Sequence, residues 1–277
     1  MSPIKGGQKI LILGVSGFLG SELYRELYAF FDVYGTYRTP DKDLHNNNKF
    51  FEWDFELDSI HFLLSELQPD LIISCLKGNF AGQVYTHFEI CEYLEKYNKK
   101  LMYISSANVF DAFTNYPSYE YDKTLSESSY GRYKIKIENR LMRLPNHLYN
   151  IIRLPMVYGY NSPKIKELKL LLELDEAVEV FPNVVINATT HQKFTQQMHY
   201  IINQDLEGIY HLGSRDLIHH KDLIKDIGKA LGYDHFLFKN VYSSNRDRYI
   251  AVLPKTHVLP EHLYISIEDI IYNSVKL

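Results

Sequence analysis

A strand, a glycine loop and a helix follow one another at the start of this chain, and this succession constrains the fold more than any other feature of the sequence. The apolar run at residues 10–13 leads directly into Gly14-Val-Ser-Gly17-Phe-Leu-Gly20, where a helical pattern begins. Gly14 permits a tight turn, Gly17 lets the backbone approach a pyrophosphate, and Gly20 lets the helix pack closely on the strand. A helix start also offers N–H groups and a positive dipole end to an anion. The segment therefore predicts a nucleotide-binding loop.

The first 160 residues alternate short apolar runs with helical patterns. Strands are expected at residues 9–14, 32–37, 49–54, 70–75, 100–105 and 149–154, and helices at 18–30, 58–67, 84–97 and 130–144. Uninterrupted apolar strands are buried on both faces, as strands of a parallel sheet are. Strands that alternate with helices of this length predict right-handed βαβ units, so the fold class is an α/β, doubly wound parallel sheet of the Rossmann type.

The pattern becomes less regular after residue 160. Helices are expected at 163–174, 194–203 and 221–231, with a strand at 208–212. We predict a nucleotide-binding domain over residues 1–160 and a smaller C-terminal lobe over residues 161–277, with chain segments free to cross this boundary. Ligands of such sheets bind at the carboxyl ends of the strands. The lobe is therefore expected to grip a substrate there.

Composition excludes several other functions. The net charge of -4 argues against a nucleic-acid partner, because phosphate binding normally needs a basic face. No apolar run approaches the roughly 18 residues that span a bilayer, and the run at residues 10–13 is too short for a signal peptide. The 2 cysteines, Cys75 and Cys91, show no metal-ligand spacing. We expect a cytoplasmic protein without a metal, a membrane partner or a nucleic-acid partner.

The end of the second predicted strand indicates whether the chain prefers NADP or NAD as its cofactor. An NAD-selective site usually carries an acid about 20 positions after the glycine loop, bonded to the ribose 2′-OH. This strand instead ends Gly35-Thr-Tyr-Arg38, and Arg38 offers a guanidinium fork to a 2′-phosphate. A solvated surface arginine is the alternative. The sequence thus favours NADP(H), with NAD as a second option.

Tyr130 and Lys134 are four residues apart, so they share one face of a helix. A phenol has an ordinary pKa near 10, and a neighbouring ammonium lowers that pKa toward the range useful for acid–base catalysis. The same lysine can hold the hydroxyls of the nicotinamide ribose. Upstream, Ser106 follows an apolar strand and can donate a hydrogen bond to a substrate carbonyl. In a chain with 23 tyrosines, a pair of this spacing also arises by chance on surface helices.

These segments resemble a known family. The spacing of the glycine loop is similar to that of the extended short-chain dehydrogenase/reductase superfamily. Ile104-Ser-Ser-x-x-Val-Phe-Asp111, Tyr130-Gly-Arg-x-Lys134 with Glu138, and Ile152-Arg-Leu-Pro-Met-Val-Tyr-Gly159 resemble segments of the dTDP-4-dehydrorhamnose reductases. The strand at Gly208-Ile-Tyr-His-Leu-Gly213 and the helix after it are also similar to that family. The resemblance covers nearly the whole chain.

The resemblance implies a function and a set of site residues. Ser106 is similar to the residue that polarises the C4 carbonyl, Tyr130 to the proton donor, and Lys134 to the residue that lowers its pKa. Asp54 stands where relatives hydrogen-bond the adenine, with a turn residue as the alternative. The implied cofactor contacts are Gly14, Ser16, Gly17, Phe18, Leu19, Gly20, Arg38, Asp54, Phe55, Cys75, Leu76, Lys77, Tyr130, Lys134, Pro155 and Val157. The implied reaction is NADPH-dependent reduction of a nucleotide-linked 4-keto-6-deoxy sugar, and relatives commonly form homodimers.

Departures from the family pattern keep other functions open. Ala107 and Asn108 replace an Asp-Tyr pair, Ala112 replaces a glycine, and His191 stands near a place where extended-family members carry acids. One alternative is a sugar-nucleotide 4-epimerase or dehydratase, which would retain bound NAD. Another is a non-catalytic, NADP-binding regulatory subunit. Two further acids before the Tyr130 helix, Glu120 and Asp122, are expected either to contact sugar hydroxyls or to lie in a solvated loop.

Overall fold

The computed structural model describes residues 7–39, 47–242 and 244–276. The described chain divides into two compact units, neither of which is continuous in sequence. The first unit comprises described residues of Met1–Ser105, Ser128–Ile152 and Met198–Ile209. The second comprises those of Ser106–Glu127, Arg153–Gln197 and Tyr210–Leu277. The chain thus crosses between units several times, so we describe each unit separately.

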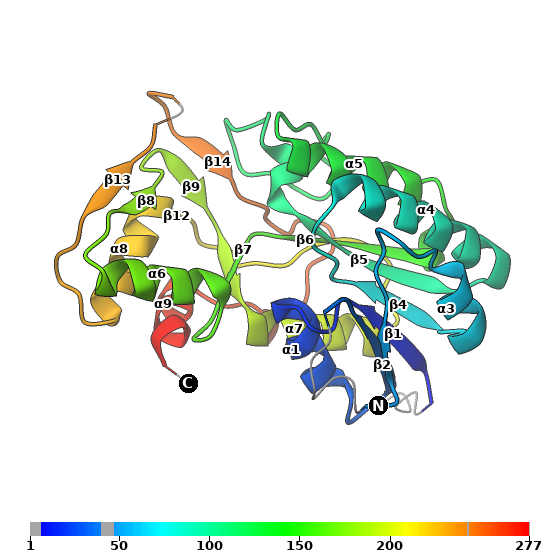
Figure 1. The fold of residues 1–277 in the computed structure, drawn as a ribbon. Helices are drawn as coiled ribbons and strands as arrows, with labels where there is room; N and C mark the ends of the chain where they lie inside the picture. Colours follow the sequence, from blue (N-terminus) through cyan, green and yellow to red (C-terminus); the bar gives the residue numbers. More distant parts are fainter. Residues whose placement is uncertain (1–6, 40–46, 243, 277) are drawn as a thin grey trace. The chain divides into compact units, whose positions relative to one another are not determined.

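The first unit is built on a seven-stranded sheet with the strand order β11-β6-β5-β4-β1-β2-β3. Figure 1 labels β6, β5, β4, β1 and β2 of this sheet. The strands are β1 (Lys9–Leu13), β2 (Asp32–Tyr37), β3 (Phe50–Glu52), β4 (Leu71–Ser74), β5 (Lys100–Ser106), β6 (Tyr149–Leu154) and β11 (Gly208–His211). The pairs β1–β2, β1–β4, β2–β3 and β4–β5 are parallel. This order, with β1 in the interior and successive strands added on both sides, is that of a doubly wound sheet and confirms the predicted fold class.

Helices cover both faces of this sheet. They are α1 (Phe18–Leu27), α3 (His61–Leu67), α4 (Phe80–Tyr97), α5 (Ser129–Leu141) and α7 (His191–Asn203), the last of which is shared with the second unit. Figure 1 shows α3, α4 and α5 on one side of the sheet and α1 on the other. The central strands are apolar and inaccessible, with Leu11, Ile72 and Leu101 among the core residues that have no exposed surface. Burial on both faces explains the uninterrupted apolar runs in the sequence.

All six strands and four helices predicted in the first 160 residues are present; β2 and β6 have the predicted bounds, and the other elements have shifted ends. The helix predicted from residue 84 begins at Phe80, because Asn79 caps it by accepting a hydrogen bond from the backbone of Gly82. The strand predicted over residues 49–54 pairs only at Phe50–Glu52. Boundaries of this kind depend on caps and pairing partners, which periodicity does not report.

The described part of the second unit consists of short strands, four α-helices, one of which is shared with the first unit, and short 3₁₀ helices. The α-helices are α6 (Pro163–Glu173), the first half of α7, α8 (His220–Ala230) and α9 (Ile267–Val275). The strands are β7 (Met156–Tyr158), β8 (Val178–Val180), β9 (Val184–Ile186), β10 (Ala188–Thr190), β12 (Ile218–His219), β13 (Phe238–Asn240) and β14 (Arg248–Ile250). A core that includes Ile165, Leu168 and Leu223 holds them together. The sequence predicted none of these strands and missed α9.

Candidate active site

The glycine loop has the geometry that its spacing predicts. Gly14 has a φ of +83°, which an L side chain rarely adopts. A Cβ atom on Gly20 would lie 2.2 Å from the carbonyl oxygen of Gly14, so only glycine lets α1 pack this closely on the loop. Gly17 is the N-cap of α1, and a Cβ atom there would meet only the Gly14 oxygen, at 3.3 Å. The side of Gly17 away from the loop is therefore open, as a backbone cradle for a pyrophosphate requires.

The loops after β2, β3 and β4 meet at one place in the first unit. Arg38, directly after β2, donates from Nη1 to Oε1 of Glu56 at 3.1 Å. A Cβ atom on Gly78, after β4, would lie 3.8 Å from Glu56 Oε1 and 3.9 Å from Arg38 Nη1. Asp54 accepts a hydrogen bond from the backbone of Glu56 at 2.9 Å. Arg38, the residue predicted to bind a 2′-phosphate, is thus already paired with the carboxylate of Glu56, which the sequence did not single out.

Tyr130 and Lys134 lie on α5, as their spacing predicts. The Tyr130 side chain is 39% exposed, whereas Lys134 is buried. The ammonium of Lys134 lies 6.0 Å from the centre of the Tyr130 ring and donates a hydrogen bond to the carbonyl oxygen of Ile104 at 2.8 Å. The rings of Tyr103 and Tyr133 lie 4.8 and 5.2 Å from the same ammonium. Lys134 is therefore a fixed cation beside an accessible phenol.

Burial lowers the pKa of Lys134 from its ordinary value of 10.5 to about 8, although nearby Glu138 and Cys75 act to raise that pKa. Glu138 has no exposed surface, and one of its oxygens accepts a hydrogen bond from the hydroxyl of Ser105 at 2.5 Å. The lysine is cationic at neutral pH because its pKa stays above 7. A cation at this position favours the phenolate form of a neighbouring tyrosine.

Sequence reasoning missed two buried side chains near Lys134. His87 of α4 lies between the carbonyl oxygen of Gln83, at 2.6 Å, and the hydroxyl of Ser74, at 2.8 Å. Burial lowers the pKa of His87 to about 4, so its ring is neutral at pH 7. Tyr103 packs edge-on against His87, and its buried hydroxyl has no hydrogen-bond partner within the described residues. Only their positions opposite Lys134 distinguish these residues, and the sequence contains no such signal.

Ser106 belongs to the second unit, where it ends β5 and caps the short 3₁₀ helix Ala107–Phe110. Its hydroxyl donates to Oδ1 of Asn108 at 3.0 Å and accepts from the backbone N–H of Asn108 at 3.2 Å. Asn108, which departs from the family pattern, thus holds the hydroxyl in place. The sequence predicts a strand-end hydroxyl at this position, and the structure contains one.

The remaining predicted cofactor residues are divided between the units. In the first, Ser16 is exposed, Phe18 and Leu19 are half-buried at the start of α1, Phe55 is buried, and Cys75, Leu76 and Lys77 follow β4. Burial raises the pKa of Cys75 to about 12, which makes this thiol unreactive. In the second, Pro155 is buried and Val157 is half-buried in β7.

Both expectations for Glu120 were wrong. Its side chain is 1% exposed, and its carboxylate accepts hydrogen bonds from the backbone N–H groups of Lys255, Thr256 and His257. It is neither solvated nor available to a sugar, because it anchors a loop of the second unit. Nearby Asp122 is exposed and accepts from the backbone of Tyr119.

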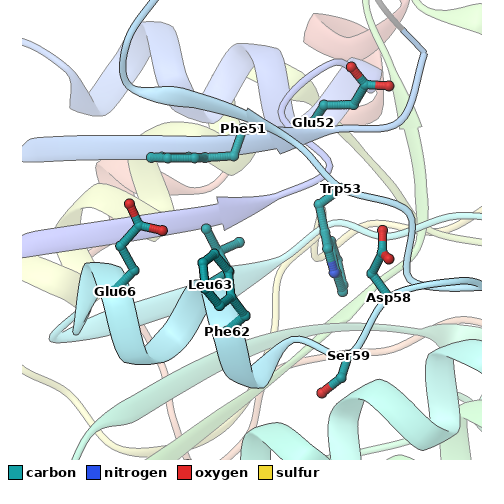
Figure 2. Close-up of a pocket in the computed structure, with 8 residues that line it drawn as sticks. All are labelled: Phe51, Glu52, Trp53, Asp58, Ser59, Phe62, Leu63 and Glu66. Carbon is teal, nitrogen blue, oxygen red and sulfur yellow. The ribbon is translucent and has the colours of Figure 1, made fainter.

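A cavity of about 410 Å³ lies in the first unit beside β3 and α3 (Figure 2). Its lining residues are Phe51, Glu52, Trp53, Asp58, Ser59, Phe62, Leu63 and Glu66. None of the predicted catalytic or cofactor residues lines it. Among the described residues, there is no cluster of three metal-ligating side chains, and no helix is both long and apolar enough to cross a bilayer.

A doubly wound sheet that opens with this glycine loop and carries the Tyr130–Lys134 helix defines the class of extended short-chain dehydrogenases/reductases. Within this class the sequence matches the family described as the RmlD substrate binding domain over residues 79–257. The chain belongs to this family, and the resemblance drawn from the sequence is confirmed. No curated protein matches the chain.

Solved structures are similar over nearly the full length. The dTDP-4-dehydrorhamnose reductase of Yersinia enterocolitica has a TM-score of 0.79 and 18% identity, covering 96% of this chain and 98% of that chain. The corresponding reductase of Bacillus anthracis, solved with NADP, has a TM-score of 0.75 and 19% identity, covering 97% and 98%. The dTDP-glucose 4,6-dehydratase of Bacillus anthracis, solved with NAD, has a TM-score of 0.78 and 15% identity, covering 97% and 96%. At these identities the likeness establishes the fold.

Proposed function

We propose that this chain is an NADPH-dependent reductase of a nucleotide-linked 4-keto-6-deoxy sugar. The observation that carries the proposal is the buried ammonium of Lys134, held 6.0 Å from the ring centre of the accessible Tyr130. Membership of the RmlD family and the fold of two dTDP-4-dehydrorhamnose reductases support the substrate class.

The residues of the glycine loop fit a dinucleotide. A Cβ atom at Gly17 would have only the Gly14 oxygen near it, at 3.3 Å, so the backbone there is open, and the N-terminus of α1 offers its dipole to the pyrophosphate. Arg38 and Asp54 would hold the adenosine end, and Lys134 the nicotinamide ribose. The reduced nicotinamide supplies a hydride to the carbonyl carbon of the sugar. The protein has to bind and orient the cofactor and the sugar, and to protonate the carbonyl oxygen of the sugar.

The proton comes from Tyr130. As the carbonyl oxygen gains negative charge, the phenol gives its proton to that oxygen and becomes a phenolate. Lys134 stabilises the phenolate, because its ammonium carries the opposite charge in a buried setting. We assign Ser106 a hydrogen bond to the same oxygen, which polarises the carbonyl. The products are a sugar alcohol and the oxidised cofactor.

The test is nicotinamide absorbance after mixing the protein with NADPH or NADH and dTDP-4-keto-6-deoxyglucose or its epimerised L-lyxo form. Oxidation is expected with at least one sugar, and Tyr130→Phe should abolish it while the cofactor still binds. Cofactor binding without oxidation of either sugar would contradict the proposed substrate and favour the regulatory alternative.

The epimerase or dehydratase alternative has one observation in its favour. Arg38 is paired with Glu56, which weakens its claim on a 2′-phosphate, and the similar dehydratase was solved with NAD. Such an enzyme would retain NAD through purification. Release of NAD from the denatured protein would therefore favour this alternative over the reductase.

A further inference from the structure

Glu56 lies between Arg38, in the loop after β2, and Asn79, in the loop after β4. Its Oε1 atom accepts from Arg38 Nη1 at 3.1 Å, and its Oε2 atom accepts from Asn79 Nδ2 at 3.3 Å. Asn79 is itself fixed, because its Oδ1 atom caps α4 through the backbone N–H of Gly82 at 3.0 Å. The carboxylate is thus held from both sides, by a cation after β2 and by an amide after β4.

We propose that Glu56 limits the preference of this chain for NADPH over NADH. The proposal rests on the proposed function, in which the adenosine end of a dinucleotide lies at the ends of β2 and β3. Arg38 is the cation directly after β2, where the fold brings the adenosine ribose. Glu56 holds that cation, so a 2′-phosphate has to share the guanidinium with a carboxylate.

Charge explains why Glu56 affects the binding of NADPH more than the binding of NADH. A phosphate monoester carries about −1.5 to −2 charges at pH 7, so Glu56 repels it and competes with it for Arg38. A ribose 2′-hydroxyl carries no charge and can donate a hydrogen bond to a carboxylate. Glu56 therefore disfavours NADPH and tolerates NADH. The Arg38 and Glu56 side chains are 54% and 33% exposed, so solvent screens the effect and keeps it moderate.

The experiment measures dissociation constants of NADPH and NADH by calorimetry for the purified chain and its variants. Glu56→Gln keeps the size of the side chain and removes its charge. We expect it to tighten NADPH about fivefold, the effect of an exposed charge pair, and to change NADH by less than about twofold. Glu66→Gln, which removes one negative charge from α3, should leave both constants unchanged.

A second variant tests whether Glu56 acts through Arg38. In an Arg38→Ala background, Glu56→Gln should change the NADPH constant by much less than it does in the wild type. An unchanged ratio of NADPH to NADH affinity in Glu56→Gln would overturn the proposal, and so would an equal effect of Glu66→Gln. If the wild type binds neither dinucleotide, the proposed function itself fails. If both dinucleotides bind and Glu56→Gln leaves the ratio of their affinities unchanged, only the role of Glu56 is refuted.

Discussion

The two units are built on different principles. The first is a seven-stranded sheet, and its strands β1 to β5 succeed one another along a single stretch of the chain. In the second, strands of two or three residues pair with partners far along the chain, as β9 (Val184–Ile186) does with β14 (Arg248–Ile250) and β8 (Val178–Val180) with β13 (Phe238–Asn240). Sequence patterns therefore predict the elements of the first unit more readily than the strands of the second, which depend on distant pairings.

The largest expected effect separates chemistry from binding within the first unit. Tyr130→Phe removes the proposed proton donor, so turnover should fall about 100- to 10,000-fold. The dissociation constant of the cofactor should change little, because the ring and its contacts with Phe80 and Tyr133 remain. Steady-state kinetics and calorimetry measure the two quantities. A variant with wild-type turnover would refute the assigned donor.

The second prediction concerns the charge of Lys134. Burial lowers its pKa to about 8, so the ammonium is present below that pH and lost as the pH rises through it. Turnover at saturating substrate should therefore fall about tenfold for each unit of pH above about 8. The measurement is a pH profile of kcat from pH 6 to 10. A profile that stays flat beyond pH 9 would contradict a role for the lysine cation.

The third prediction compares two glycines of the nucleotide loop. A Cβ atom on Gly20 would lie 2.2 Å from the backbone oxygen of Gly14, so Gly20→Ala should lower the free energy of unfolding by about 1–3 kcal/mol. Gly17→Ala, with its nearest atom at 3.3 Å, should cost less stability and yet weaken dinucleotide binding. Thermal unfolding and calorimetry distinguish these outcomes. Equal losses of stability would argue against close packing of α1 at Gly20.

The smallest expected effect lies in the second unit. Glu120→Gln weakens the buried hydrogen bonds from the backbone of Lys255, Thr256 and His257, so unfolding should cost about 1–2 kcal/mol less. The matched change Asp122→Asn, at an exposed neighbour, should have little effect. Because Glu120 is not among the proposed cofactor contacts, the dissociation constant of the cofactor should not move in either variant. A cofactor constant that shifts with Glu120→Gln would contradict a purely structural role for Glu120.

The sequence predicted the first unit well because local signals determine it. Continuous apolar runs marked β1 and β4, and the glycine spacing marked the turn into α1. In the second unit it predicted α6 and α8 but none of the strands, because strands of two or three residues are too short to show a period. Their pairing partners lie far along the chain, as in the pairing of Val184 in β9 with Arg248 in β14.

The sequence predicted the motifs of the site but not the residues that surround them in the fold. The Tyr130–Lys134 spacing identified a helix face, yet the burial that lowers the pKa of Lys134 comes from several elements at once. Glu56 escaped notice because no motif contains it, and only the folded loops bring it to Arg38. Glu120 was misassigned because nothing in the sequence places residues 255–257 beside it.

The central claim is that this chain transfers a hydride from a reduced nicotinamide to the C4 carbonyl of a nucleotide-linked sugar. The most direct measurement uses NADPH carrying deuterium at C4 of the nicotinamide, with a dTDP-4-keto-6-deoxy sugar as acceptor. Mass spectrometry and NMR of the product should find one deuterium at C4 of the sugar, and Tyr130→Phe should form almost none. A reduced sugar without deuterium at C4, or bound NADPH with no product, would contradict the claim.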